Sequence, residues 1–84
     1  MIKVNVILSP YSNADHRRVI EIMSGSSVYK AIMQAKSEGL AVYEHRRVFH
    51  NEVRVVDENS VAVVKNSVIV IFEQPKSAVH VIET

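Results

Sequence analysis

The chain has 84 residues and a formal net charge of +1, and 48% of its residues are hydrophobic. This length suits one domain with one core, and the nearly neutral charge means that binding to nucleic acid or membrane would need a local cluster of charges. The absence of cysteine excludes disulfides, thiolate metal sites and a cysteine nucleophile. We expect a cytoplasmic protein without a membrane partner, because no stretch is long and apolar enough for a signal peptide or a membrane span.

The N-terminal part of the sequence predicts two strands joined by a wide turn. Apolar side chains alternate along residues 2–8 and again along residues 18–22, which is typical of strands with one buried face. Residues 9–15, with Pro10 and several small polar side chains, form the turn between them.

A short helix is expected near residues 27–38. Val28, Ala31, Ile32 and Ala35 recur at helical spacing and form one apolar stripe. The preceding serines offer hydroxyl groups for an N-cap, and Gly39 suits the left-handed position just after the helix ends.

The second half of the sequence predicts further strands. Residues 48–50 and 53–56 flank a tight turn at Asn51-Glu52. Residues 68–72 are apolar at every position, which indicates a central strand that is covered on at least part of both faces. Residues 61–64 fit either an extended crossing segment or a short strand.

Three short motifs resemble those of the ubiquitin-like β-grasp proteins, nearest the sulfur-carrier branch (the thiamine-pathway carrier and the small subunit of molybdopterin synthase). Residues 25–32 resemble its Gly-Thr-Val entry into the helix, residues 48–53 its Val-x-Val-Asn-Gly hairpin, and residues 64–70 its Leu-x-x-Gly-Asp-x-Val-x-Val approach to the last strand. The resemblance implies an α+β fold of the β-grasp class, a mixed sheet of four to five strands with one helix packed across it. Residues 1–76 would form this domain and residues 77–84 a C-terminal tail.

The C-terminal end departs from the pattern of these proteins. Sulfur carriers and ubiquitin end in Gly-Gly, whose carboxylate is adenylated, whereas this sequence ends Val81-Ile82-Glu83-Thr84. Asn66-Ser67 also stands where that branch has Gly-Asp. We therefore do not expect carrier chemistry, and a degenerate relative of the sulfur carriers is the third of three functional hypotheses.

No pattern of catalytic or metal-binding residues stands out in the sequence. His45 and His50 are five residues apart, which places them on opposite faces of a continuous strand, and His16 and His80 are distant from both. We interpret the histidines as solvated surface residues. No serine lies in a nucleophile elbow, and Asp57-Glu58 is interpreted as an exposed pair of acids. We expect no enzyme activity, no metal and no cofactor.

A five-residue pattern occurs twice, because Asp15-His16-Arg17-Arg18-Val19 is echoed by Glu44-His45-Arg46-Arg47-Val48. Each copy lies where a strand is expected to begin. In a β-grasp sheet the first and last strands are parallel and central, so the second and third strands begin at one end, about 14 Å apart. We call this end the basic pole, and we define it by Arg17, Arg18, Arg46, Arg47, His16, His45 and Lys76.

Two interpretations of the basic pole remain open. Arginines hold carboxylates or phosphates through two parallel hydrogen bonds, so the pole is a candidate surface for a protein partner or for RNA, with Tyr11 or Tyr43 stacking on bases. Alternatively, the arginines only keep the strand ends soluble and pair with Asp15, Glu44 and Glu73.

The apolar, alternating residues 78–82 have no evident place in the predicted sheet. They suit an added strand, either on this sheet or on the edge of a partner, and they allow a homo-oligomer. Our first hypothesis is a small non-catalytic binding module that docks a protein partner through the basic pole and the tail, as an inhibitor or modulator of that partner. The second is an antitoxin-like RNA-binding regulator that uses the same arginines.

Overall fold

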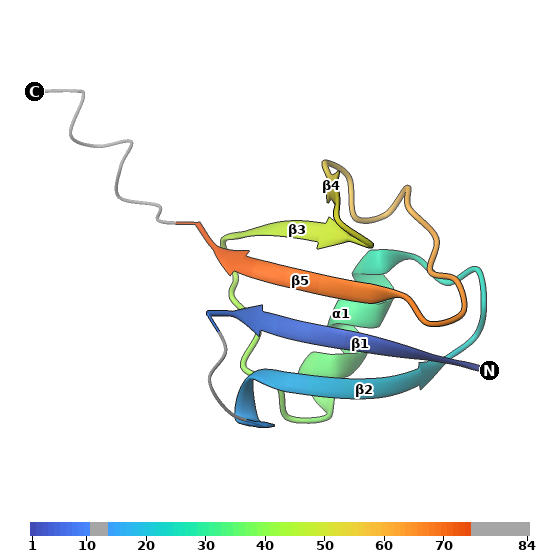
Figure 1. The fold of residues 1–84 in the computed structure, drawn as a ribbon, viewed down its shortest axis with the longest axis horizontal. Helices are drawn as coiled ribbons and strands as arrows, with labels where there is room; N and C mark the ends of the chain where they lie inside the picture. Colours follow the sequence, from blue (N-terminus) through green and yellow to red (C-terminus); the bar gives the residue numbers. More distant parts are fainter. Residues whose placement is uncertain (11–13, 75–84) are drawn as a thin grey trace, which may run out of the picture.

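The computed structural model describes residues 1–10 and 14–74. Within these residues the chain forms five strands, one α-helix and a single 3-10 turn. The strands and the α-helix are labelled in Figure 1. In chain order these are β1 (Ile2–Ser9), η1 (Ala14–His16), β2 (Arg17–Ile22), α1 (Val28–Ser37), β3 (Arg46–His50), β4 (Val53–Val55) and β5 (Val68–Glu73).

The five strands form one mixed sheet of order β2-β1-β5-β3-β4. β1 and β5 are parallel neighbours at the centre, and β2 and β3 run antiparallel to them on either side. α1 crosses one face of this sheet, which we call the helix face (Figure 1). No described helix or strand covers the opposite face, which we call the outer face. The predicted α+β class, with one helix and a mixed sheet, is therefore confirmed.

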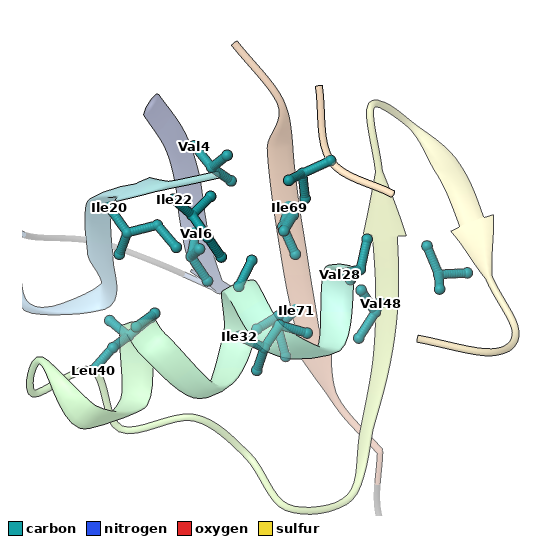
Figure 2. Close-up of a cluster of buried hydrophobic side chains, with 14 of the residues drawn as sticks. Val4, Val6, Ile20, Ile22, Val28, Ile32, Leu40, Val48, Ile69 and Ile71 are labelled. Atoms are coloured by element: carbon teal, nitrogen blue, oxygen red, sulfur yellow. The ribbon is translucent and has the colours of Figure 1, made fainter. Parts of the chain in front are cut away.

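The core lies between the helix face and α1. Alternate side chains of the central strands point toward the helix, and Val28 and Ile32 of the helix point back toward the sheet (Figure 2). All four apolar side chains predicted as the helix stripe are buried in this core. Each fully buried valine, leucine or isoleucine side chain in this layer stabilises the fold by about 1.5–3 kcal/mol. The side chains that meet in this layer are at most 1% exposed: Val4, Val6, Leu8, Val28, Ala31, Ile32, Ala35, Ile69 and Ile71.

Both ends of α1 are fixed as the sequence predicts. The Ser27 hydroxyl accepts a hydrogen bond from the Lys30 backbone N–H at 3.0 Å, which is an N-cap. At the other end Gly39 has a φ of +113°, and the Leu40 N–H donates to the Ala35 carbonyl at 3.0 Å. These bonds satisfy backbone groups that the helix itself leaves without partners.

The tight turn between β3 and β4 is tied to the start of β5. Asn51 and Glu52 have φ values of +50° and +72°, as a two-residue hairpin turn of type I′ requires. The Asn51 side-chain oxygen accepts from the Val68 N–H at 2.9 Å, and the Asn51 N–H donates to the Val68 carbonyl at 2.9 Å. The hairpin is thereby held in register with the central strand.

Residues 61–64 form the crossing segment that the sequence left open as one of two possibilities. Ala62 makes an isolated bridge to Ser27, and the Val63 N–H donates to the Ser26 carbonyl at 2.8 Å. Val63 is fully buried, so this segment seals the core beside the start of α1.

No helix in the described part of the chain is long and apolar enough to cross a membrane. Tyr11, Lys76, His80 and the predicted tail, residues 77–84, lie outside the described residues. The hypotheses that rest on them stay predictions.

Candidate functional site

The two copies of the repeated pattern lie at the same end of the sheet. β2 and β3 both run opposite to the central pair, so Arg17 and Arg46 stand where β1 and β5 finish (Figure 1). Successive side chains of a strand point to opposite faces, however. Each Arg-Arg pair is therefore divided, with one guanidinium on the helix face and one on the outer face.

Arg46 is held inside the molecule on the helix face. Its Nε and Nη2 donate to the two carboxylate oxygens of Glu58 at 2.9 and 2.8 Å, and its Nη1 donates to the Tyr43 carbonyl at 2.8 Å. The side chains of Arg46 and Glu58 are only 12% and 19% exposed. This bidentate pair joins the start of β3 to the loop after β4, so Arg46 has a structural role.

Arg18 also lies on the helix face, in a more exposed ion pair. Its Nε is 3.2 Å from Glu38 Oε1, and the two side chains are 48% and 33% exposed. Glu38 follows the last turn of α1 and also accepts from the Gln34 side-chain amide at 3.1 Å. Glu38 and Glu58 are both distant in sequence from their arginines, and neither is among the acids that the sequence suggested as partners.

Arg17 and Arg47 are the pole arginines on the outer face. Arg47 lies directly across from Phe72 in the sheet, and its guanidinium carbon is 5.7 Å from the centre of that ring. This distance suits a cation–π contact. Arg17 is exposed opposite Ile7, whose side chain is half-buried on the same face. Both guanidinium groups therefore border the same side of the sheet.

Apolar side chains run across the centre of the outer face. Directly opposed residues share a face, so the pairings Ile7–Val70 and Val70–Phe49 join three strands into one apolar row. Phe49 and Phe72 meet beside this row with ring centroids 5.5 Å apart and an interplanar angle of 77°. A hollow of about 690 Å³ opens here, lined by Phe49, Asn51, Glu52, Val68, Val70 and Phe72.

Charged side chains surround this apolar row. Arg54 of β4 faces Phe49 across the hairpin, and Lys3 of β1 lies near the far edge. Of the charged residues that the strand pairings and the hollow place on the outer face, four are cationic and two are acidic: Lys3, Arg17, Arg47, Arg54, Glu21 and Glu52. The outer face is thus an apolar centre with a mainly positive border.

The histidines separate into different environments. His16 is half-buried in η1 and His45 is exposed just before β3. His50 is half-buried, and its Nε2 is 2.7 Å from the hydroxyl of the buried Ser67. The interpretation of the histidines as solvated is therefore wrong for His50, because its bonding partner comes from a turn 17 residues away. The described residues hold no group of three or more side chains suited to a metal ion.

Tyr43 does not provide the exposed ring for base stacking that the sequence predicted. It is half-buried against the core, and its hydroxyl donates to the Ser9 carbonyl at 3.2 Å. The aromatic rings that border the outer face are instead Phe49 and Phe72, which the sequence-based hypothesis did not include. The alternation of β3 was a signal that could have found Phe49, since it places that ring on the same side as Arg47, whereas the side of Phe72 depends on the pairing of β5 with β3.

Asp57 is the one described side chain with a clearly shifted pKa. The Ser60 hydroxyl donates to it at 2.7 Å and the Asn59 N–H at 3.0 Å, and these bonds lower its pKa below the ordinary 3.8. The group is fully exposed and caps a turn. This is the geometry of a loop-stabilising carboxylate, because both donors come from the same turn.

Comparison with known proteins adds no family assignment. No model of a protein family matches the chain, and a search of curated proteins finds no match.

Proposed function

We propose that this protein is a non-catalytic binding module of the β-grasp type, which docks a partner through the outer face of its sheet. The parallel central pair, the strand order and the single helix across one face support the β-grasp assignment. The observation that carries the binding function is the outer face itself, where an apolar row with a mainly positive border is left uncovered by the described helices and strands.

The contrast between the two faces supports this function. The helix face is filled by the core and its arginines are used in internal ion pairs. On the outer face Ile7, Val70 and both phenylalanines stay half-buried, so apolar surface remains in contact with water. A contiguous apolar surface with a polar border is typical of an interaction site. Burying it against a partner removes that surface from water and stabilises the complex.

The charges on the border define what the partner must present. Cations outnumber acids around the apolar row, so a matching surface carries negative charge around an apolar or aromatic centre. Within the basic pole, this assigns the binding role to Arg17 and Arg47. Arg18 and Arg46 then support the fold, and a domain docked over an acidic surface would act as a modulator of its partner.

Three versions of the tagged full chain test the function by recovery of ligands from native cells. One is unaltered. The second reverses three exposed cations of the outer face through Arg17→Glu, Arg47→Glu and Arg54→Glu. The third is a matched control that reverses three exposed cations elsewhere, through Lys30→Glu, Lys36→Glu and Lys65→Glu. Circular dichroism checks that all three versions fold.

We expect the outer-face version to lose ligands that the unaltered chain and the control both retain. A recovered protein or nucleic acid is evidence for binding by the outer face only if it follows this pattern. Equal recovery by all three folded versions, or a loss confined to the control, would overturn the assignment of the outer face as the binding surface.

A further inference from the structure

We propose that the partner of the outer face is single-stranded RNA, an inference that rests on the proposed function and names the ligand of the same surface. Its central observation is the pair of phenylalanine rings on adjacent strands. Phe49 of β3 and Phe72 of β5 meet edge to face, with centroids 5.5 Å apart. Sheet-borne aromatic rings of this kind are the platforms on which unpaired bases stack in RNA-binding domains.

The rings lie where a strand of RNA could reach them. Both are half-buried, so each is anchored by the sheet, and no described helix or strand covers the face that carries them. Arg47 already places a planar cation against Phe72. Guanidinium planes stack on bases as well as on protein rings, so this arginine can extend the platform.

Arginines stand at both ends of the apolar row. In strand order the row runs through Arg17, Ile7, Val70, Phe49 and Arg54. Four interstrand steps separate its two ends, which is about 19 Å. A single strand laid along the row would bring bases over the apolar centre and phosphates toward the arginines at its ends. This combination of a positive border and a stacking surface is how proteins hold single strands without requiring one sequence.

The hollow beside the rings offers a place for one base. Its volume of about 690 Å³ lies between Phe49, Phe72 and the polar turn at Asn51. The Asn51 side-chain oxygen is held by the Val68 N–H, which leaves the amide nitrogen as the group that can donate to a base edge. A base that can leave the stack and present its Watson–Crick edge exists only in an unpaired strand, so a duplex should not fill the hollow.

Two features favour RNA over an acidic protein. Three of the four outer-face cations are arginines, which suit phosphate and base stacking together. The centre is aromatic as well as aliphatic, and stacking on a base requires the π-face of a ring, whereas an apolar protein anchor requires only hydrophobic surface. Replacing phenylalanine by leucine therefore separates the two partners, because leucine keeps the apolar surface and removes the π-face.

Fluorescence anisotropy with labelled RNA of about 10 nucleotides, a length within the site sizes of single-strand binders, measures the affinity of the full chain. Mixed-sequence, uridine-only and adenosine-only strands are compared with a duplex of the mixed sequence. With about three phosphate contacts, affinity should fall about 20-fold between about 50 and 200 mM salt. The duplex should bind more weakly than the single strands, and a DNA strand of the same sequence shows whether the 2′-hydroxyl contributes.

The decisive variants are Phe49→Leu and Phe72→Leu. Each should weaken binding about tenfold, in line with the loss of one base stack. Lys30→Ala and Lys36→Ala, on the exposed side of α1, are the controls and should leave the affinity unchanged. If a leucine variant does not fold, Arg17→Gln with Arg54→Gln replaces it, and that pair should flatten the salt dependence because two contacts are lost.

The outcomes separate this inference from the proposed function. RNA binding that is about tenfold weaker in the leucine variants supports both. If no single strand binds at low salt, or the folded leucine variants bind RNA with unchanged affinity, the RNA inference is overturned. In that case, the unaltered chain could still recover a protein from ribonuclease-treated cell extract that the charge-reversed outer-face version does not recover. The binding function would then stand, with a protein partner. If neither RNA nor protein depends on the outer face, both proposals fall.

Discussion

Arg46 and Arg47 are neighbours in sequence, but their guanidinium groups lie on opposite faces of the sheet. Arg46 binds the Glu58 carboxylate on the helix face, and Arg47 lies against the Phe72 ring on the outer face. The repeated Arg-Arg pattern therefore combines a structural residue with a candidate binding residue. Several consequences of this division, and of the contacts around it, are open to measurement.

Replacing Arg46 by alanine should mainly reduce stability, whereas replacing Arg47 by alanine should mainly reduce ligand binding. Arg46→Ala should lower the free energy of unfolding by about 2 kcal/mol, because the charged hydrogen bonds to Glu58 are lost. Arg47→Ala should lower it by less than about 1 kcal/mol, the range of an exposed cation–π contact, and should weaken ligand binding instead. Urea denaturation measures the first effect. Equal destabilisation by the two substitutions would contradict the division between faces.

The two ion pairs of the helix face should differ in strength. A double-mutant cycle on Arg46 and Glu58 should give a coupling free energy of about 1–2 kcal/mol, since both side chains are largely buried. The same cycle on Arg18 and Glu38 should give less than about 0.5 kcal/mol, because solvent screens that exposed pair. Thermal or urea unfolding of the seven proteins, the unaltered chain and three variants for each pair, supplies both values. A stronger coupling in the Arg18 pair would be inconsistent with the burial described above.

The buried hydroxyl of Ser67 should be needed for stability. It accepts from the Val64 N–H at 2.9 Å and lies 2.7 Å from His50 Nε2, with Ser67 itself 1% exposed. Ser67→Ala leaves both partners without this bond and should cost about 1–3 kcal/mol of unfolding free energy. Ser37→Ala is the matched control, since this exposed hydroxyl donates to Gln34, and it should change stability by less than about 0.5 kcal/mol.

The left-handed backbone at Glu52 should be relieved by glycine. Glu52 has a φ of +72°, a conformation that costs an ordinary side chain roughly 1 kcal/mol. Glu52→Gly should therefore raise the melting temperature, and it should raise RNA affinity because an acid is removed from the hollow. Asn66→Gly, at a φ of +64°, is the control with a smaller gain, because asparagine tolerates this region better. A lower melting temperature for Glu52→Gly would contradict the view that the backbone at Glu52 is strained.

The lowered pKa of Asp57 predicts a pH dependence of stability. A carboxyl group whose pKa is lowered by folding stabilises the protein above its unfolded pKa and loses that contribution as the pH falls through the folded value. The unaltered protein should thus be more stable than Asp57→Asn near neutral pH, because the bonds from Ser60 and Asn59 favour the ionised form. The difference should shrink as the pH falls below about 3.8, the ordinary value. Melting curves of both proteins from neutral to acid pH provide the measurement, and a constant difference would contradict this role.

Local patterns in the sequence were sufficient for the elements and for the layer that packs the core. The helix stripe from Val28 to Ala35, the Ser27 cap and the Asn51-Glu52 turn all depend on residues within one or two turns of each other. The same alternation that predicts β1 also predicts which of its side chains are buried. Because these signals are local, they need no knowledge of how the strands are arranged.

The candidate site required the arrangement of the strands. The sequence places Arg17, Arg18, Arg46 and Arg47 at the starts of strands, and the topology gathers them at one end of the sheet. Their roles are set by contacts between residues far apart in sequence. Glu38 and Glu58 form ion pairs with Arg18 and Arg46, and Phe72 contacts Arg47. Phe49 and Phe72 were absent from the sequence-based site because each, alone, is indistinguishable from a core residue.

The sequence by itself thus determined where the helix and strands form and which side chains pack between them, because hydrophobic period and capping act over a few residues. Only the tertiary structure decided which arginine of each pair supports the fold and which borders the outer face. The physical reason is that the face on which a side chain lies, its burial and its ion pairs depend on strand register and on partners brought together from distant parts of the chain.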